Sequence, residues 1–248
     1  MVKSGRINLN TPLTLTAPTY LWLAFTVFLP LSAMFFFSFL TDAPFGNKEV
    51  FFSLENYQAI WDKTFYQLLL FKSFRLGLEV TVLCFLIGFP CALILAKHVK
   101  GYWREAIFVL IILPFWSNAL VRIFSWTMVL RGNGVIEMTL NWISPGFGDF
   151  SLMFTYQAIL IGLVHSYLPY MILTCYVSIQ SIDDSIIEAA RVLGASRIKI
   201  LMRLIIPLSL PGIAAGSVLI FIPVVGSFME PRILGGREGT FIGTIIED

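Results

Sequence analysis

The sequence DDSIIEAARVLGASRIKILMR, residues 183–203, holds all the charge of a long stretch of this chain. No Asp, Glu, Lys or Arg occurs between Phe150 and Ile182, or between Leu204 and Met229. A membrane-spanning helix needs roughly 20 mostly apolar residues, so each flank is long enough to contain one. The pattern therefore predicts two membrane spans joined by a short charged loop.

The composition of the whole chain agrees with a membrane protein. Hydrophobic residues make up 57% of the 248 positions and charged residues only 13%, with 23 Phe, which lies outside the range of soluble globular domains. A net charge of +2 gives no reason to expect nucleic-acid binding. The sequence contains no Gly-rich Lys-Ser/Thr phosphate loop, no metal-ligand spacing and no plausible catalytic group. We therefore expect neither an enzyme nor a metal site, and no cofactor on this chain.

Hydropathy predicts an all-α polytopic helical bundle with five spans. They lie at about 18–40, 76–96, 106–129, 155–177 and 207–229. A signal peptide is the rival interpretation of the first, but its apolar run is too long and lacks a small-residue cleavage site. With a cytoplasmic N-terminus, basic residues are denser in the inner segments, which favours that orientation. It makes residues 1–17 a cytoplasmic tail and places residues 183–206, here called the charged loop, in the cytoplasm.

Some features lie outside this plan of spans. A mixed polar and aromatic segment at 54–74 predicts an external amphipathic helix before the second span, and 135–143 predicts another before the fourth. The three cysteines, Cys84, Cys91 and Cys175, fall inside predicted spans, where small buried packing residues are expected.

The charged loop has an internal pattern of its own. Ser185 and Glu188 have the spacing of a capping box that begins a short helix, and Gly194 ends it. Ser196 is placed to cap a second short helix through Met202, and Pro207 to open the fifth span. The predicted product is a helix–glycine–helix elbow. An ordinary hairpin loop, with Glu188 as nothing more than a cap, is the alternative.

One motif in the charged loop favours the elbow. Glu188-Ala189-Ala190-x-x-x-Gly194 is followed after nine residues by Leu204-x-Ile206-Pro207. This resembles the EAA loop of ABC importer permease subunits, with Leu and Ile in place of the usual Ile and Leu. The resemblance implies a coupling helix that docks on an ATP-binding subunit, which would hold the ATP and Mg. The residues that it assigns to docking are Ser185, Glu188, Ala189, Ala190, Gly194, Ala195 and Pro207.

Further segments resemble the spermidine/putrescine branch of these permeases. They are Gly88-Phe-Pro90, the block from Leu113 to Trp126 that begins Leu-Pro-Phe-Trp, Gly132-Asn-Gly134, and Ile222-Pro223 with Leu234-Gly235-Gly236. Relatives that import ferric iron, thiamine, aminoethylphosphonate or opines share parts of this pattern. The similarity covers nearly the whole chain and implies a permease domain over 18–248. It also implies a sixth span, which the sequence up to Asp248 does not contain.

The resemblance also implies partners and a location. The partners are a dimer of ATP-binding subunits, a second, different permease subunit, a periplasmic or extracellular solute-binding protein, and membrane lipid. The location is the bacterial cytoplasmic membrane, with transport by alternating access. A secondary carrier driven by an ion gradient is the competing class. It should show charged residues deep in the membrane and paired halves, and we find neither.

Polar and aromatic groups at membrane depth are the candidates for a substrate path. They are Glu79, Trp116, Tyr167, Tyr170 and Glu230. Each has a plainer interpretation: Glu79 pairs with Arg75 one turn earlier, Glu230 lies at the membrane interface, and the aromatic rings serve packing. A cation at Arg122 would repel a polyamine, so snorkelling or pairing at a gate suits it better. His165 is expected to be a neutral, hydrogen-bonded histidine. Pro211, Pro223 and the Gly212-x-x-x-Gly216 spacing predict a kinked fifth span in close contact with another helix.

Overall fold

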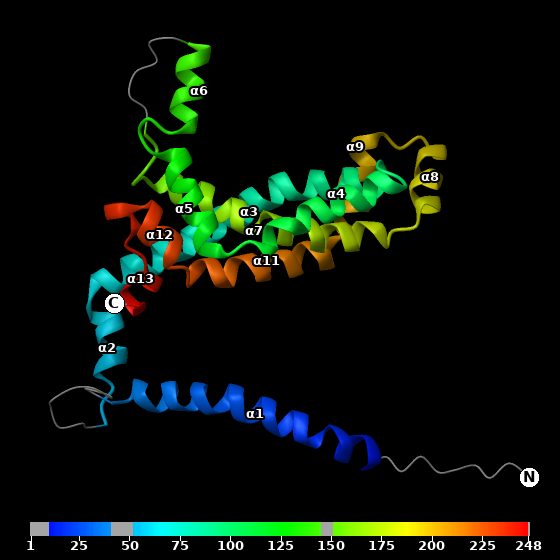
Figure 1. Cartoon of the computed structure of the whole chain (residues 1–248). Helices are drawn as coiled ribbons and strands as arrows, with labels where there is room; N and C mark the ends of the chain where they lie inside the picture. The colour runs from blue at the N-terminus through cyan, green and yellow to red at the C-terminus, as the bar shows by residue number, and fades with distance from the viewer. Residues whose placement is uncertain (1–9, 41–51, 145–150, 248) are drawn as a thin grey trace, which may run out of the picture. The chain divides into compact units, whose positions relative to one another are not determined.

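The computed structural model describes residues 10–40, 52–144 and 151–247 (Figure 1). Apart from one isolated bridge, every regular element in these ranges is a helix, as predicted for an all-α protein. The helices are α1 Asn10–Ser38, α2 Glu55–Asp62, α3 Thr64–Lys97, α4 Tyr102–Ile112, η1 Leu113–Trp116, α5 Ala119–Leu130, α6 Val135–Ile143, α7 Tyr156–Gln180, α8 Asp184–Val192, α9 Arg197–Ile200, the π-helix η2 Leu201–Ile205, α10 Ile206–Leu208, α11 Leu210–Val225, α12 Met229–Leu234, η3 Gly236–Gly239 and α13 Ile242–Glu247. Residues 1–9 of the predicted tail lie outside the described residues.

The chain divides into two compact units, Met1–Gln67 and Leu68–Asp248. In the first unit, the Asn56 side chain donates hydrogen bonds to the carbonyls of Ser38 and Leu40, both at 3.0 Å. These bonds satisfy carbonyls that the end of α1 leaves without helical partners. The amphipathic helix predicted at 54–74 is wrong as a single element, because the chain breaks at Lys63 between α2 and α3. Its second half belongs to the long helix that includes the second predicted span.

Three helices in the described ranges are long and apolar enough to cross a membrane: Thr16–Ser38, Thr64–Lys97 and Tyr156–Gln180. Two bent pairs pass the same test, so the number of spans rises to five if each pair makes one crossing. Tyr102–Trp116 meets Ala119–Ile143 at 96°, and Arg197–Leu208 meets Leu210–Val225 at 64°. The predicted third and fifth spans are therefore interrupted helices.

Each interruption has a local cause in the sequence. After Trp116 the chain becomes extended at Ser117, and the Asn118 side chain then caps α5 by accepting from the Leu120 amide at 2.8 Å. In the second pair, Pro207 has no N–H to donate and crowds the carbonyl one turn earlier, so the helix widens into the π-turn. Pro211 adds the same defect, and the bend falls at Ser209. Pro207 lies inside the helix before the bend, so the prediction that it opens the fifth span is wrong.

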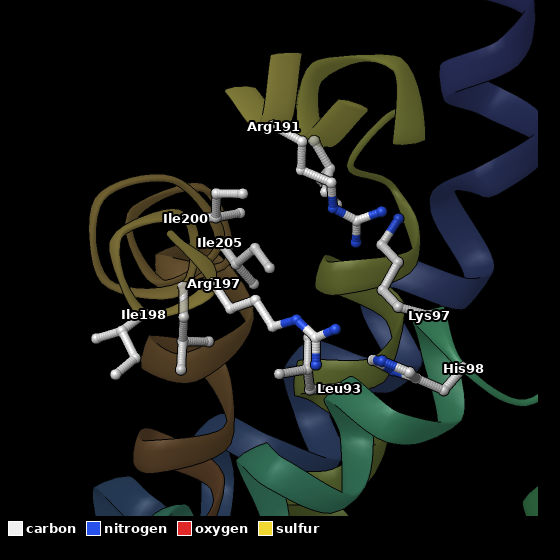
Figure 2. Close-up of a pocket in the computed structure, with 10 residues that line it drawn as sticks. Leu93, Lys97, His98, Arg191, Arg197, Ile198, Ile200 and Ile205 are labelled. Atoms are coloured by element: carbon white, nitrogen blue, oxygen red, sulfur yellow. The ribbon is translucent and has the colours of Figure 1, made fainter. Parts of the chain in front are cut away.

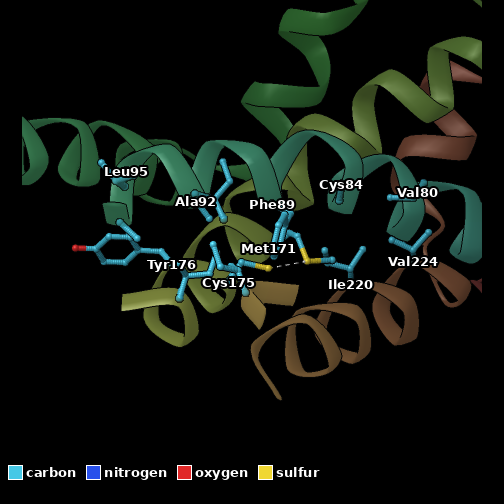
Figure 3. Packing of buried hydrophobic residues seen from close by; sticks show 14 of the residues in the cluster. Val80, Cys84, Phe89, Ala92, Leu95, Met171, Cys175, Tyr176, Ile220 and Val224 are labelled. Carbon is cyan, nitrogen blue, oxygen red and sulfur yellow. Dashed lines mark hydrogen bonds between the residues drawn. The ribbon is translucent and has the colours of Figure 1, made fainter. Parts of the chain in front are cut away.

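The core of the second unit lies among α3, α7 and α11. Figure 3 shows Phe89 of α3 next to Met171 of α7 with Ile220 of α11 beside it, and Val80 of α3 opposite Val224 of α11. Apolar side chains form this cluster, so its packing depends mainly on shape. Cys84 and Cys175 are buried as predicted, whereas Cys91 is exposed and the prediction is wrong for it.

The close helix contact predicted from Gly212 and Gly216 is confirmed. A Cβ at Gly212 would collide with the Ser178 side chain and the Thr174 carbonyl, and one at Gly216 with the Thr174 hydroxyl. Because glycine has no side chain, α11 approaches α7 at a distance that other residues forbid.

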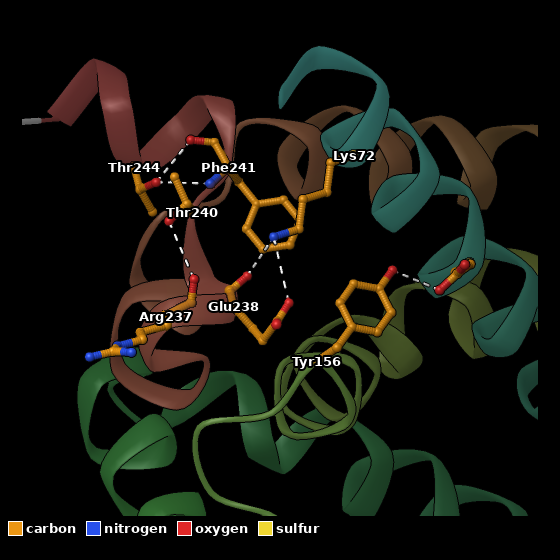
Figure 4. A network of polar contacts seen from close by, with 8 residues as sticks. Lys72, Tyr156, Arg237, Glu238, Thr240, Phe241 and Thr244 are labelled. Carbon is orange, nitrogen blue, oxygen red and sulfur yellow. Dashed lines mark hydrogen bonds and ion pairs between the residues drawn. The ribbon is translucent and has the colours of Figure 1, made fainter. Parts of the chain in front are cut away.

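A polar cluster lies near the N-terminal end of α3, at Lys72 (Figure 4). Lys72 Nζ donates to the Glu238 carbonyl at 2.8 Å and lies 4.5 Å from the centre of the Phe241 ring. The Thr244 hydroxyl accepts from the Phe241 amide at 3.0 Å. The segment after α12 is thereby attached to α3, while α8 and α9 lie at the other end of α3 and α7 (Figure 1).

Candidate functional site

The charged loop begins with a helix cap that differs from the predicted one. Asp183 is the N-cap of α8, and its Oδ1 accepts from the Ser185 amide at 2.9 Å. The capping box predicted at Ser185 and Glu188 is therefore wrong, because an aspartate two residues earlier takes the cap and Ser185 lies inside the helix. This hydrogen bond holds the pKa of Asp183 below its usual range. Ser196 caps α9 as predicted, accepting from the Lys199 amide at 3.3 Å.

The end of α8 involves two residues of the Glu-Ala-Ala motif, Ala190 and Gly194. Gly194 adopts a φ of +77°, which confirms the left-handed stop. The Ala195 amide donates to the Ala190 carbonyl at 3.0 Å, and the Gly194 amide to the Arg191 carbonyl at 2.9 Å. These two bonds form a Schellman motif, which closes a helix around a glycine. The elbow is thus a property of local backbone hydrogen bonds.

The faces of α8 differ sharply in what they contact. Ile187 is buried in the core, while Glu188 and Ala189 are exposed. Val192 and Leu193 are each 87% exposed. They form an exposed aliphatic pair beside the turn at Gly194. Neither residue was predicted from the sequence, although their position directly before Gly194 in a charged loop was a usable signal.

Lys97, the last residue of α3, joins the charged loop to the helical core. Its Nζ donates to the Ile182 carbonyl at 2.6 Å and to Asp184 Oδ1 at 2.7 Å. The hydrogen bond from Lys97 lowers the pKa of Asp184. One side chain therefore binds the segment between α7 and α8 and also the first residue of α8.

A second candidate region is a cavity of about 320 Å³, here called the aromatic cavity. Phe115, Tyr167 and Tyr170 contribute rings, and Glu230, Ser166, Ser227 and Arg122 contribute polar groups. The centres of the Phe115 and Tyr170 rings are 4.6 Å apart, and those of Tyr167 and Tyr170 are 6.0 Å apart. Three predicted path residues, Tyr167, Tyr170 and Glu230, thus line one cavity.

Glu230 is the carboxylate of this cavity. It lies in the first turn of α12, is buried, and accepts from the Ser227 hydroxyl at 2.9 Å. Gly162 of α7 lies beside it, and a Cβ there would collide with the Leu234 side chain of the same helix, α12. A buried carboxylate requires hydrogen bonds or a cation to offset lost hydration. Among the described residues, only one of its two oxygens receives a hydrogen bond.

Arg122 brings a positive charge to the same cavity. Its Nη1 donates to the Pro114 carbonyl at 3.2 Å, across the break between η1 and α5. Its Nε is buried and has no hydrogen-bond partner in the part of the chain that the structure describes. The side chain lines the aromatic cavity and a neighbouring one. Snorkelling and pairing at a gate both remain predictions.

The other predicted path residues lie elsewhere. Glu79 accepts from Arg75 Nε at 2.7 Å and from the Tyr156 hydroxyl at 2.7 Å, which links α3 to α7. Trp116 is 89% exposed and does not line the aromatic cavity. His165 accepts from Trp126 Nε1 at 3.2 Å through its Nδ1, as expected for a neutral histidine.

Comparison with known proteins gives a family. Residues 88–247 match the model of the binding-protein-dependent transport system inner membrane component. The chain belongs to this family. It is 37% identical over 226 residues to the spermidine/putrescine transport system permease protein PotB of Escherichia coli (strain K12), covering 91% of this chain and 82% of that protein. PotB of Haemophilus influenzae is 34% identical over 227 residues, covering 91% and 78%.

The fold of the permease is also that of a solved transporter. A crystal structure of a bacterial ABC transporter involved in the import of the acidic polysaccharide alginate matches with a TM-score of 0.69, covering 94% of this chain and 81% of that one. At 18% identity this likeness establishes the fold alone. The chain is thus a helical membrane permease subunit of the ABC importer kind, as the sequence predicted.

Proposed function

We propose that this permease carries a polyamine of the spermidine or putrescine class through the membrane. The observation that carries the proposal is the aromatic cavity, where buried Glu230 lies among the rings of Phe115, Tyr167 and Tyr170. Carboxylates attract ammonium groups, and aromatic faces stabilise cations without binding water strongly. The PotB relatives are named as spermidine/putrescine permeases, which supports the same substrate class.

The proposed mechanism is alternating access driven from the charged loop. A dimer of ATP-binding subunits, which holds the ATP and Mg, docks on Glu188, Ala189 and Ala190 of α8 with the exposed pair Val192 and Leu193. Lys97 connects the start of α8 to α3 and to the end of α7, so movement of α8 is passed to the core. The bend at Ser209 lets α11 swing relative to α9 and α10. A second permease subunit and an external solute-binding protein complete the importer.

The proposed location is the bacterial cytoplasmic membrane, with a cytoplasmic N-terminus. The family description, an inner membrane component, supports the membrane. Basic residues of the charged loop, such as Arg191 and Arg197, support a cytoplasmic position for it, as does Lys97 at the end of α3, which contacts the loop.

Uptake of labelled spermidine and putrescine into vesicles that contain the complete importer tests the substrate. We expect saturable ATP-dependent uptake. We expect Glu230→Gln to raise the half-saturation concentration about tenfold or more, because the proposed buried ion pair between Glu230 and a substrate ammonium group is lost. Glu105→Gln is the matched control, since Glu105 is exposed and lies outside the aromatic cavity. Uptake of neither polyamine, or equal uptake by both variants, would contradict the proposal.

A further inference from the structure

A larger cavity of about 650 Å³ lies where α3 ends, between α8, α9 and the π-helix. It is here called the basic cavity, because four of its lining residues are Lys97, His98, Arg191 and Arg197. Among the described residues, no carboxylate lines it. It shares no residue with the aromatic cavity, so it is separate from the proposed substrate site.

The cationic groups come from three elements that border this space. Figure 2 shows the Arg191 guanidinium group near the Lys97 ammonium group, and the Arg197 guanidinium group beside Leu93 and His98. Lys97 is paired with Asp184. Within the described ranges, the side chains of Arg191 and Arg197 make no hydrogen bond or ion pair. Like charges brought together repel one another, and a bound anion removes that cost.

The rest of the cavity wall is aliphatic. Leu93 of α3, Ile187 of α8, and Ile198, Ile200, Leu201 and Ile205 of the segment after Gly194 line it. Ile198 is 75% exposed. A free phosphate or nucleotide would use the cations and leave this apolar wall in water. A molecule with an anionic head and hydrocarbon chains would cover both surfaces.

The basic cavity also lies beside the end of a helix that is long and apolar enough to cross a membrane. Lys97 is the last residue of that helix, α3, and His98 follows directly. Basic pockets beside membrane helices on the cytoplasmic side are suited to anionic lipid headgroups.

We propose that the basic cavity binds an anionic phospholipid. Its phosphate lies among Lys97, Arg191 and Arg197, and its acyl chains lie against the aliphatic wall. Because Arg191 precedes Gly194 and Arg197 follows it, one headgroup bridges both arms of the elbow. This proposal does not depend on which solute the permease carries.

The test measures lipid retained by the purified full chain. The chain is purified in mild detergent, exposed to equal amounts of phosphatidylglycerol and phosphatidylcholine, and analysed by native mass spectrometry. Each basic residue near a membrane surface contributes about a factor of five in affinity for anionic lipid. We therefore expect the double variant Arg191→Gln/Arg197→Gln to bind phosphatidylglycerol about 25-fold more weakly. The variant Arg191→Lys/Arg197→Lys should retain most of the binding.

The matched control is Lys199→Gln/Arg203→Gln. It removes the same charge from the same segment, but both residues are exposed and lie outside the basic cavity. We expect it to bind phosphatidylglycerol as the wild type does. An equal loss of phosphatidylglycerol binding in both double variants would show that binding depends on surface charge in general and not on this cavity. It would overturn the proposal. So would equal retention of the two lipids by the wild type.

Two further outcomes identify a different occupant. Displacement of phosphatidylglycerol by millimolar inorganic phosphate would assign the cavity to a free anion. Loss of ATP-binding subunit association in Arg191→Gln/Arg197→Gln, with lipid retention unchanged, would assign it to a protein carboxylate. Either result overturns the proposal. A thermal melt of each variant in phosphatidylcholine alone separates these results from misfolding, since only a folded variant is compared.

Discussion

Lys97 Nζ lies 2.7 Å from Asp184 Oδ1, and this contact joins the last residue of α3 to the first residue of α8. Its two residues are 87 positions apart in the sequence. The same ammonium group also satisfies the Ile182 carbonyl at 2.6 Å. A largely buried lysine, whose side chain is 11% exposed, therefore links the charged loop to α3.

The contact has a defined pH dependence. Because Lys97 lowers the pKa of Asp184, the pair contributes stability at pH values above the unfolded pKa of the aspartate. That contribution is lost as the pH falls through the lower pKa of the folded state. We expect Asp184→Asn to lower the melting temperature slightly at pH 7, and the difference from the wild type to vanish in strong acid. A difference that grows as the pH falls would contradict this assignment.

The left-handed residue of the elbow makes a second prediction. Gly194 has a φ of +77°, and no atom lies within 4 Å of the position that a Cβ would take, so a substitution there meets backbone strain rather than a clash. A β-branched residue carries the larger strain, and asparagine tolerates this conformation. We expect Gly194→Val to reduce stimulation of ATP hydrolysis by the solute-binding protein severalfold, while Gly194→Asn keeps most of it. Wild-type stimulation in Gly194→Val would contradict a role for the elbow.

The contact between α7 and α11 gives a prediction about stability. Gly212→Val places carbon atoms against the Ser178 side chain and the Thr174 backbone, and a backbone carbonyl has little freedom to move. We expect a loss of about 1–3 kcal/mol, the usual cost of overpacking a core. Gly226→Ala is the matched control, because the nearest atom to its Cβ position is 3.9 Å away. Thermal unfolding in detergent measures both, and equal melting temperatures would contradict the close packing.

The exposed aliphatic pair at the end of α8, Val192 and Leu193, gives a prediction about docking. Val192→Ser/Leu193→Ser should weaken association with the ATP-binding subunit about tenfold or more, since buried aliphatic anchors contribute over ~1 kcal/mol in many interfaces. Met202→Ser removes an exposed apolar side chain from the same segment and serves as the control. Copurification at matched expression levels measures the effect. Unchanged copurification of the double variant would place the docking surface elsewhere.

Local sequence signals predicted the local structure well. Gly194 and Ser196 act as expected, and the helix predicted at 135–143 has those bounds in the structure. The capping box failed because two caps compete within three residues and Asp183 is the one that forms. The interrupted third segment was missed because hydropathy is averaged over about 20 residues. Ser117 and Asn118 are polar but too few to break the apolar average, and hydropathy does not register a bend.

The candidate cavity needed more than the sequence. Glu79 and Glu230 are both carboxylates near the ends of apolar segments, and the sequence offers a local ion-pair partner, Arg75, only for Glu79. The fold separates them: Glu79 pairs with Arg75 and accepts a hydrogen bond from Tyr156, whereas Glu230 lines a cavity with aromatic residues. Arg122 enters the same cavity only because the break after Trp116 turns α5 toward α7.

The sequence alone determined that this is a helical membrane protein, which residues form its charged loop and which residue stops the first helix of that loop. Those properties follow from hydropathy and from backbone preferences of single residues, which act over a few positions. Only the tertiary structure decided which polar residues share a cavity and that Lys97 holds Asp184. Such contacts join residues far apart in the chain, and their geometry depends on how α3, α7 and α11 pack together.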